Sequence, residues 1–464
     1  MSSPGDELAV ESIVDSRVSR QAVIAACFAA ATVGALVNAS SSALAVHRLA
    51  GMNRPGGSDI GLFGYLSGSA AVATVIGLVV LRLAAHRGWP WLLVAGTVLG
   101  MPATLTEIDP TMFTEDLPLE LVYVTGGASP ALVTIGLLGA ATLLCRNGFP
   151  PIGGALAGAV AGVAWLGLTV FVHAFTGTGG SLDTLHTVLA AVSLAGATGA
   201  VVINRALPRA TVGQPPTWLV VAAASVAAAL PVVLDLVLRQ SDQVVTIGVA
   251  GVALLVVAVS LAATAGSRAV VGTAAVALIN VGLFTPFALA AGGMRGHLDL
   301  MWVFALVGLL LGCAAGLNRW RAWYGAGACA LLSLILLAFT VGVSTPPSDG
   351  DPYLPYAVLL SLAVFAVTAS VATTGAALGP RSVAAPVIGA FAVTAQVGTA
   401  YALNLTQIGQ TGEATVFNGG EATLIAGALL LVACVLVMGV GSGTEPSTVD
   451  DDEEPAGLPV NSAN

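Results

Sequence analysis

The chain has 464 residues, of which 56% are hydrophobic and only 8% charged, with a formal net charge of −9. Soluble globular proteins carry about 25% charged residues, so this composition excludes a soluble fold, whose surface must be largely polar. The negative balance comes largely from one run of acids, Asp450–Glu454, which reads as a solvated tail, and nothing favours nucleic-acid binding.

Apolar runs of about 20 residues recur along the chain, the length that crosses a hydrocarbon core about 30 Å thick. Lipid offers no partners to backbone polar groups, and uniformly apolar runs favour helices over the alternating strands of a barrel. The sequence therefore predicts an all-α polytopic membrane protein with about fourteen transmembrane helices. The predicted spans are 21–46, 60–81, 89–108, 126–145, 152–175, 184–204, 217–238, 244–265, 269–291, 298–317, 322–343, 354–377, 382–406 and 420–441.

The positions of the Arg residues predict the orientation of these helices. If the N-terminus is cytoplasmic, eleven of the fifteen basic residues lie on the cytoplasmic side, as the positive-inside rule requires. The acidic loop Glu107–Glu120 and the loop Ser344–Pro355 then face outward. The first 20 residues lack the basic start and early apolar run of a cleaved signal. We therefore expect a protein of the plasma (inner) membrane with both termini in the cytoplasm.

Two short polar connections resemble each other, Arg82–Trp91 (RLAAHRGWPW) and Gly316–Tyr324 (GLNRWRAWY). Each lies between two apolar runs, and upstream of each is a run with one Asn near its middle, ALVN ending at Asn38 and ALIN ending at Asn280. This echo predicts two related six-helix halves separated by an inserted helix pair. The predicted parts are a disordered N-terminus (1–20), the first half (21–205), the inserted pair (206–268), the second half (269–442) and an acidic disordered tail (443–464).

The first connection resembles a motif of the major facilitator superfamily, the turn Gly-x-Leu-Ala-Asp-Arg-x-Gly-Arg-Arg between helices 2 and 3. Leu83, Ala84 and Gly88 match this turn, whereas Ala85 replaces the acid and His86 the first Arg. The helix count is similar to that of the fourteen-helix branch, whose best-known members are drug:proton antiporters. The resemblance implies transport by alternating access. The basic residues that it places at gating turns are Arg82, Arg87, Arg319 and Arg321.

Uncharged polar residues inside the spans are candidates for a substrate cavity. In the superfamily, helix 1 and the first helix of the second half face the central cavity, so the resemblance implies that Asn38 and Asn280 line it at related positions. Hydrogen bonds between packed helices, worth about 1 kcal/mol each, explain such residues equally well. The cavity candidates are Asn38, Ser41, Asn280, Gln396 and Asn404.

Charged residues inside a bilayer cost about 2.5–3.5 kcal/mol each, so ionisable residues within or near the ends of spans are candidates for proton coupling. These candidates are Glu107, Asp109, Asp183, His186 and Asp235. Asp183 and His186 are three residues apart on one helix and could share a proton near neutral pH. Plainer explanations are a solvated helix end for Glu107 and Asp109, an N-cap for Asp183, and an ion pair of Asp235 with Arg239.

Small and aromatic residues suggest how the helices pack. Gly154, Gly158 and Gly162 recur at four-residue spacing, which predicts close approach to a neighbouring helix and also suits two alternative packings. Trp residues flank both Arg-rich connections and are expected to anchor them at the membrane interface. They are Trp89, Trp91, Trp320 and Trp323.

No phosphate-cradling loop, metal-ligand spacing or nucleophile constellation stands out, so we predict no enzyme activity, no cofactor and no metal. The expected partners are the lipid bilayer and a small molecule. The leading hypothesis is efflux of an apolar or weakly polar small molecule, with proton coupling as one version of it. The alternative is a transport-inactive scaffold or accessory subunit in cell-envelope assembly with an envelope-protein partner, motivated by the missing acid at Ala85. A lipid-modifying enzyme is the least favoured hypothesis.

Overall fold

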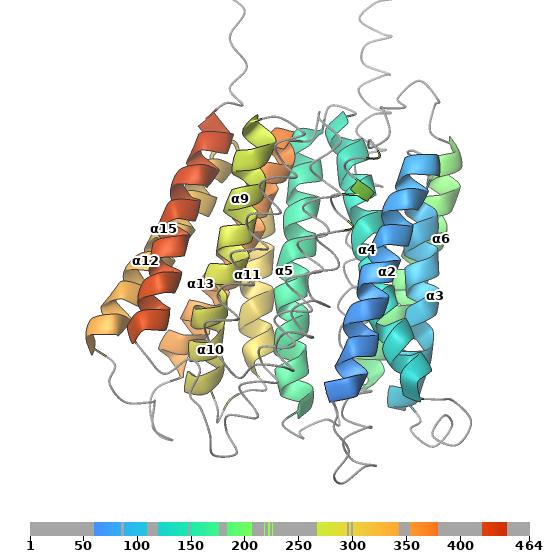
Figure 1. Ribbon diagram of the computed structural model, residues 1–464, viewed down its shortest axis with the longest axis horizontal. Coiled ribbons are helices and arrows are strands. Elements are labelled where there is room, and N and C mark those ends of the chain that lie inside the picture. Colours follow the sequence, from blue (N-terminus) through green and yellow to red (C-terminus); the bar gives the residue numbers. More distant parts are fainter. Residues whose placement is uncertain are drawn as a thin grey trace, which may run out of the picture.

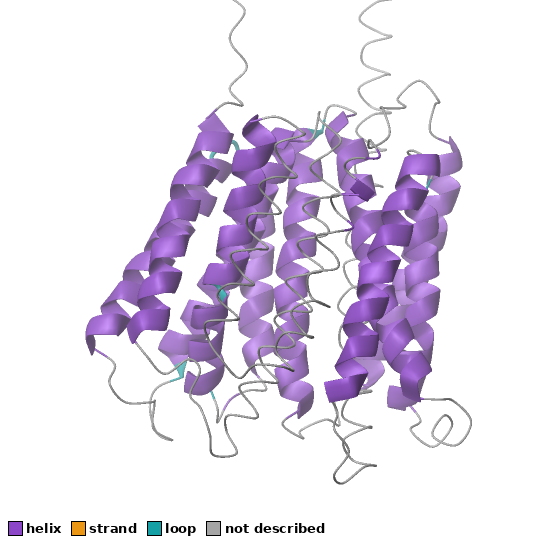
Figure 2. Ribbon diagram, viewed as in Figure 1, coloured by secondary structure: helices purple, strands orange, loops and turns teal. Residues whose placement is uncertain are grey.

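The apolar runs form helices in the computed structural model, and the described residues contain no strand (Figure 2). Helices satisfy every backbone hydrogen bond within one segment, which is why apolar sequences of this length adopt them in lipid. The structure describes residues 60–84, 88–108, 119–146, 149–175, 183–206, 218, 221–222, 225, 267–294, 297, 300–342, 353–378 and 420–442.

The first group of helices packs around α4. Its members are α2 (Ile60–Ala84), α3 (Trp89–Ile108), α4 (Leu119–Arg146), α5 (Pro150–Phe175) and α6 (Asp183–Ala206). Both α2 and α3 lie against α4, and α6 lies against α3. Glycines permit the close approach, since a Cβ on Gly96 of α3 would meet Val133 of α4. The Ser129 hydroxyl of α4 also donates a hydrogen bond to the carbonyl of Gly96, at 2.7 Å.

The second group of helices lies beside the first. Its members are α9 (Ser267–Gly282), α10 (Phe284–Gly293), α11 (Met301–Leu317), α12 (Arg321–Gly342), α13 (Leu354–Leu378) and α15 (Gly420–Ser442). Helix α15 contacts α9 and α12, and α13 contacts α11 and α12. Figure 1 shows α5 between this group and the remaining helices of the first group.

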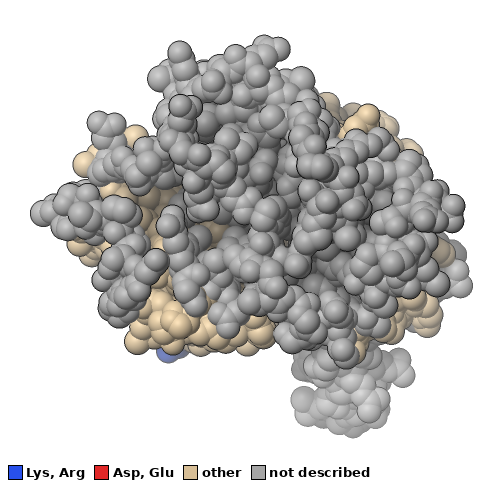
Figure 3. All heavy atoms as spheres, turned by 90° about the horizontal axis from the view of Figure 1, so that it is seen from below, with Lys and Arg blue, Asp and Glu red and all other residues tan. Residues whose placement is uncertain are grey.

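The outer faces of the helices are those of a multi-pass membrane protein. Leu310, Leu334 and Val435 are each at least 60% exposed, which water would oppose and lipid favours. Figure 3 shows one end of the molecule, where the visible described residues are mostly uncharged, with a small basic patch at the edge. Six described helices are long and apolar enough to cross a membrane. Their spans are Val124–Cys145, Pro150–Gly167, Val270–Phe287, Arg321–Phe339, Leu354–Ala377 and Thr423–Gly441.

Ten of the predicted spans coincide with described helices, and four lie outside the described residues: 21–46, 217–238 (apart from four positions), 244–265 and 382–406. Span 89–108 matches α3 at both ends, whereas α4 begins at Leu119 rather than at 126. Glu107 and Glu120 therefore belong to helix ends and not to a connecting loop.

The span predicted as one helix over 269–291 is instead two helices, α9 and α10, joined at Leu283. Pro286 explains the break, because it has no N–H to donate to the carbonyl four residues earlier, that of Gly282. Backbone bonds resume on both sides, from Leu283 N to Ile279 O at 2.9 Å and from Phe287 N to Leu283 O at 3.1 Å. The two helices thus form one interrupted span.

Candidate functional site between the two groups of helices

Helix α5 of the first group is inserted against α11 and α13 of the second, and we call these contacts the central interface. The predicted glycines form its α5 side. A Cβ at Gly154 would meet the Ala372 carbonyl of α13, and one at Gly158 would meet the Thr368 carbonyl. At each position, backbone atoms of α13 occupy the space that a side chain would need. This confirms the close approach that the four-residue spacing predicted.

A second series of glycines on α11 contacts the same face of α13. A Cβ at Gly312 would meet the Thr368 side chain, and one at Gly316 would meet Ala372. Thr368 and Ala372 are therefore held between glycines of two helices. The Thr368 hydroxyl donates to the carbonyl of Val364 in its own helix, at 2.7 Å. Because this hydroxyl is satisfied locally, it forms no described polar bond across the interface.

A hydrogen bond joins the two groups near the middle of the bundle. The indole Nε1–H of Trp165 on α5 donates to Oδ1 of Asn280 on α9, at 3.1 Å. The amide Nδ2 of Asn280 donates back to the Val276 carbonyl at 2.9 Å, which fixes the orientation of the side chain. The Trp165 ring also lies 5.6 Å from that of Phe287, just beyond the helix break. Trp165 is 3% exposed and Asn280 8% exposed, so the bond is shielded from solvent.

At one end of the central interface, the Cys145 thiol at the end of α4 lies between two carbonyl oxygens. Its Sγ is 3.8 Å from Pro150 O in the first group and 3.8 Å from Gly375 O in the second. Arg321, half-buried at the start of α12, lies near the same thiol. The described contacts between the two groups thus extend from Cys145 at one end of the central interface to Trp165 near the middle.

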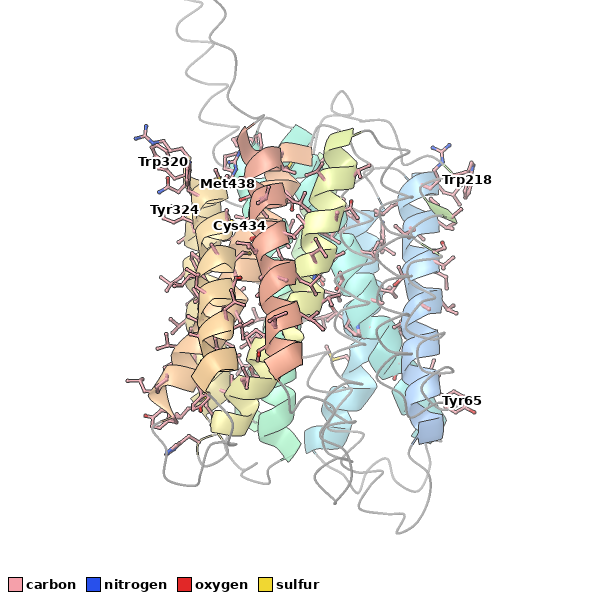
Figure 4. All side chains as sticks on the ribbon, turned by 60° about the vertical axis from the view of Figure 1, so that its left-hand side comes forward. Tyr65, Trp218, Trp320, Tyr324, Cys434 and Met438 are labelled. Carbon is pink, nitrogen blue, oxygen red and sulfur yellow. The ribbon has the colours of Figure 1, made fainter. Side chains whose placement is uncertain are left out.

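The Arg residues of the two polar connections each lie over a Trp ring. The guanidinium carbon of Arg82 is 5.5 Å from the ring centroid of Trp218, and that of Arg319 is 5.4 Å from that of Trp320. Trp218 and Trp320 lie at the same end of the bundle, away from Tyr65 (Figure 4). The described Arg–Trp contacts of both connections thus lie at the same end of the bundle.

No family model matches the chain, and no characterised protein matches its sequence. Solved structures match its fold. XylE, a major facilitator superfamily proton:xylose symporter of E. coli, is 14% identical over 92% of this chain and 96% of XylE, with a TM-score of 0.48. A bacterial homologue of the iron transporter ferroportin, solved in an outward-facing state, is 13% identical over 90% of this chain and 99% of that chain, with a TM-score of 0.52. The chain shares its fold with this homologue of a transporter.

The likeness to this homologue extends over 90% of the chain and concerns the fold alone. The structure neither tests nor excludes a match to the fourteen-helix branch, because four predicted spans lie mostly or wholly outside the described residues. Among the described residues, no group of three or more His, Cys, Asp and Glu could hold a metal ion.

Of the predicted cavity residues, the structure describes Asn280, which makes the interhelical bond that was the alternative explanation for it. Its role in a cavity stays a prediction. Glu107 lies in the last turn of α3, and Asp183 and His186 lie in the first turn of α6, so these proton-coupling candidates occupy helix ends. The predicted residues outside the described part are Asn38, Ser41, Gln396, Asn404, Asp109, Asp235 and Arg87.

Trp165 is a residue of the site that sequence reasoning did not select. A Trp within an apolar span has an N–H that needs a partner, and so does the amide of Asn280. The sequence therefore shows that both groups need a hydrogen-bond partner, but it does not show that the two groups bond to each other. Trp89, expected at the membrane interface, is instead only 8% exposed, because it packs against α4 at Gly139. Trp91, Trp320 and Trp323 are each at least 50% exposed, as expected of interfacial anchors.

Thr273 on α9 offers a simple test of the packing of this region. It is 1% exposed, and its Oγ1 has no hydrogen-bond partner among the described residues. A buried unpaired hydroxyl costs about 1–3 kcal/mol, so Thr273→Val is expected to raise the free energy of unfolding by about 1 kcal/mol. Thr74→Val is the control, because Thr74 Oγ1 donates to Ala70 O at 2.8 Å and its loss brings no such gain. Equal effects in chemical unfolding would contradict the assignment.

Proposed function

We propose that the chain is a secondary transporter that moves a small apolar or weakly polar molecule across the plasma membrane by alternating access. The observation that carries the proposal is the central interface, where two groups of helices meet through glycines, with the hydrogen bond between Trp165 and Asn280 near its middle. The polar contacts identified between the described residues of the two groups are few, so separating the groups breaks mainly apolar packing contacts. The likeness of fold to a transporter homologue supports the proposal.

The polar residues buried in the described part favour an uncharged substrate. They are all Thr, Ser or Asn, without a buried charge among them. A strongly charged molecule would need a counter-charge in the cavity, because an isolated ion is costly to desolvate. Efflux as the direction, protons as the coupling ion and a cytoplasmic location for both termini complete the proposal, and the sequence resemblance and the Arg distribution support them.

Cys145 supplies the test. Its thiol is 6% exposed between the two groups, at the end where the Arg-rich connections lie. In a variant whose other cysteines are Ser, we expect slow alkylation of Cys145 by a membrane-permeant maleimide. Substrate or an imposed proton gradient is expected to change the alkylation rate about tenfold or more, because moving the groups apart uncovers the thiol. A compound that changes the rate is then tested for flux in proteoliposomes.

A second candidate function is that of a transport-inactive scaffold in cell-envelope assembly. The observation that favours it concerns the Arg-rich connections, where Arg82 and Arg319 contact Trp rings while Ala85 stands where the family's turn has an acid. A scaffold predicts one constant alkylation rate for Cys145 under all conditions and stable co-purification with an envelope protein. A rate that responds to a compound, together with flux of that compound, would reject the scaffold.

A further inference from the structure

One surface cluster has no ligand in the proposed transport cycle, although the resemblance counts its Arg319 among the gating residues. It consists of Arg319, Trp320, Trp323 and Tyr324 around the start of α12, and we call it the aromatic elbow. Trp320 is 50%, Trp323 61% and Tyr324 43% exposed, and Arg319 is exposed beside them. Three large aromatic side chains around one exposed cation are costly in water but suit the boundary between headgroups and acyl chains.

The elbow continues into an apolar surface on the neighbouring helix. Figure 4 shows Trp320 and Tyr324 on the same side of the bundle as Cys434 and Met438 of α15, with Tyr65 at the opposite end. Helix α15 packs against α12, and its Val435 is 66% exposed. A molecule with a polar head and an apolar tail would therefore find a cation and aromatic groups at one level and aliphatic side chains below them.

The charge of the elbow has no acidic counterpart nearby in the sequence. No Asp or Glu occurs between Asp299 and Asp349, on either side of Arg319. The guanidinium carbon of Arg319 lies 5.4 Å from the centroid of the Trp320 ring, and the group carries five N–H donors in its plane. A phosphate oxygen is the acceptor that such donors bind most strongly, and often in pairs.

We propose that the aromatic elbow binds the phosphodiester headgroup of an anionic phospholipid, with Arg319 on the phosphate and the lipid chains along α12 and α15. The exposed aromatic residues place the cation at the depth where headgroups lie. An anionic leaflet attracts each surface Arg by about 1 kcal/mol. The site therefore selects phosphatidylglycerol over phosphatidylcholine, whose headgroup carries no net charge.

The test is native mass spectrometry of the full-length protein in detergent with equal concentrations of phosphatidylglycerol or phosphatidylcholine. We expect Arg319→Gln to lower phosphatidylglycerol binding about fivefold, the factor equivalent to about 1 kcal/mol, and to leave phosphatidylcholine binding unchanged. Arg319→Lys keeps the charge and is expected to retain most of the binding. Tyr65→Leu, an exposed aromatic at the opposite end, is expected to change neither lipid.

Three results would overturn the proposal. The first is equal binding of phosphatidylglycerol by the parent and Arg319→Gln. The second is complete displacement of the lipid by an equal concentration of inorganic phosphate, which would make the elbow a site for free phosphate. The third is phosphatidylglycerol binding that is unaffected by Arg319→Gln in the full chain but is lowered by it once residues 443–464 are removed. That result would mean that Arg319 pairs with the acidic run Asp450–Glu454 in the full chain.

Discussion

A Gly158→Ala variant is expected to unfold more easily than the parent by about 1–3 kcal/mol, the usual cost of overpacking a close contact. In an ordinary exposed helix position the same change stabilises by about 1 kcal/mol, so the expected sign is reversed. The reason is the central interface, where the added Cβ would overlap the Thr368 carbonyl and lie 2.9 Å from the Cβ of Ala372. Backbone atoms cannot move aside as the end of a flexible side chain can.

The matched control is Gly327→Ala on α12. Gly327 is exposed, and a Cβ there would meet nothing within 4 Å, so this change is expected to be neutral or stabilising. Thermal and chemical unfolding in the same detergent would measure both variants. Shifts of the same sign and size would show that α5 does not approach α13 as closely as described.

Overpacking at Gly158 also has a consequence for the proposed transport cycle. The added methyl group penalises the conformation in which α5 and α13 touch, and it leaves the separated conformation unaffected. Cys145 lies at the end of this contact, with its thiol near Gly375 of α13. We therefore expect faster alkylation of Cys145 in Gly158→Ala than in Gly327→Ala, in the variant that keeps Cys145 as its one cysteine.

Much of the fold was readable from the sequence because lipid imposes a simple rule. Each apolar run must be a helix of about 20 residues, so α3 could be placed at both ends from composition alone. The break at Leu283 was not predicted, although Pro286 was visible, because a Pro within a membrane helix can also be accommodated without interruption. Pro130 inside α4 is an example, since that helix continues through it.

The candidate site was less predictable, because it depends on which helices are neighbours. The spacing of Gly154, Gly158 and Gly162 predicted a close contact but not its partner, which is α13. Asn280 was selected as a polar residue in an apolar span, yet its bond to Trp165 joins residues 115 positions apart in the chain. Local patterns show that a group needs a partner, and only the fold shows which partner it has.

The bond between Trp165 and Asn280 predicts the second large effect. Asn280→Ala removes the Oδ1 acceptor of the Trp165 N–H in an apolar interior, and the loss of a hydrogen bond costs about 0.5–1.5 kcal/mol. Trp165→Phe removes that donor while keeping an aromatic ring against Phe287. We expect each single variant to be destabilised, and the double variant to be less destabilised than the sum by about 1 kcal/mol. Unfolding of the four proteins under one condition gives this coupling, and additivity within about 0.3 kcal/mol would show that the bond contributes nothing.

The same variants distinguish a hydrogen bond that only stabilises the fold from one that also takes part in transport. If the two groups part during alternating access, the Trp165 N–H and the Asn280 amide lose each other and face the opened space together. A substrate with a hydrogen-bond acceptor then takes the place of Asn280 on Trp165. A compound that accelerates Cys145 alkylation in the parent is therefore expected to lose about tenfold or more of its potency in Trp165→Phe, since a lost bond to a buried donor costs about 1–3 kcal/mol. If the compound keeps its potency in Trp165→Phe while the variant is destabilised as predicted, the bond between Trp165 and Asn280 serves only to hold the helices together.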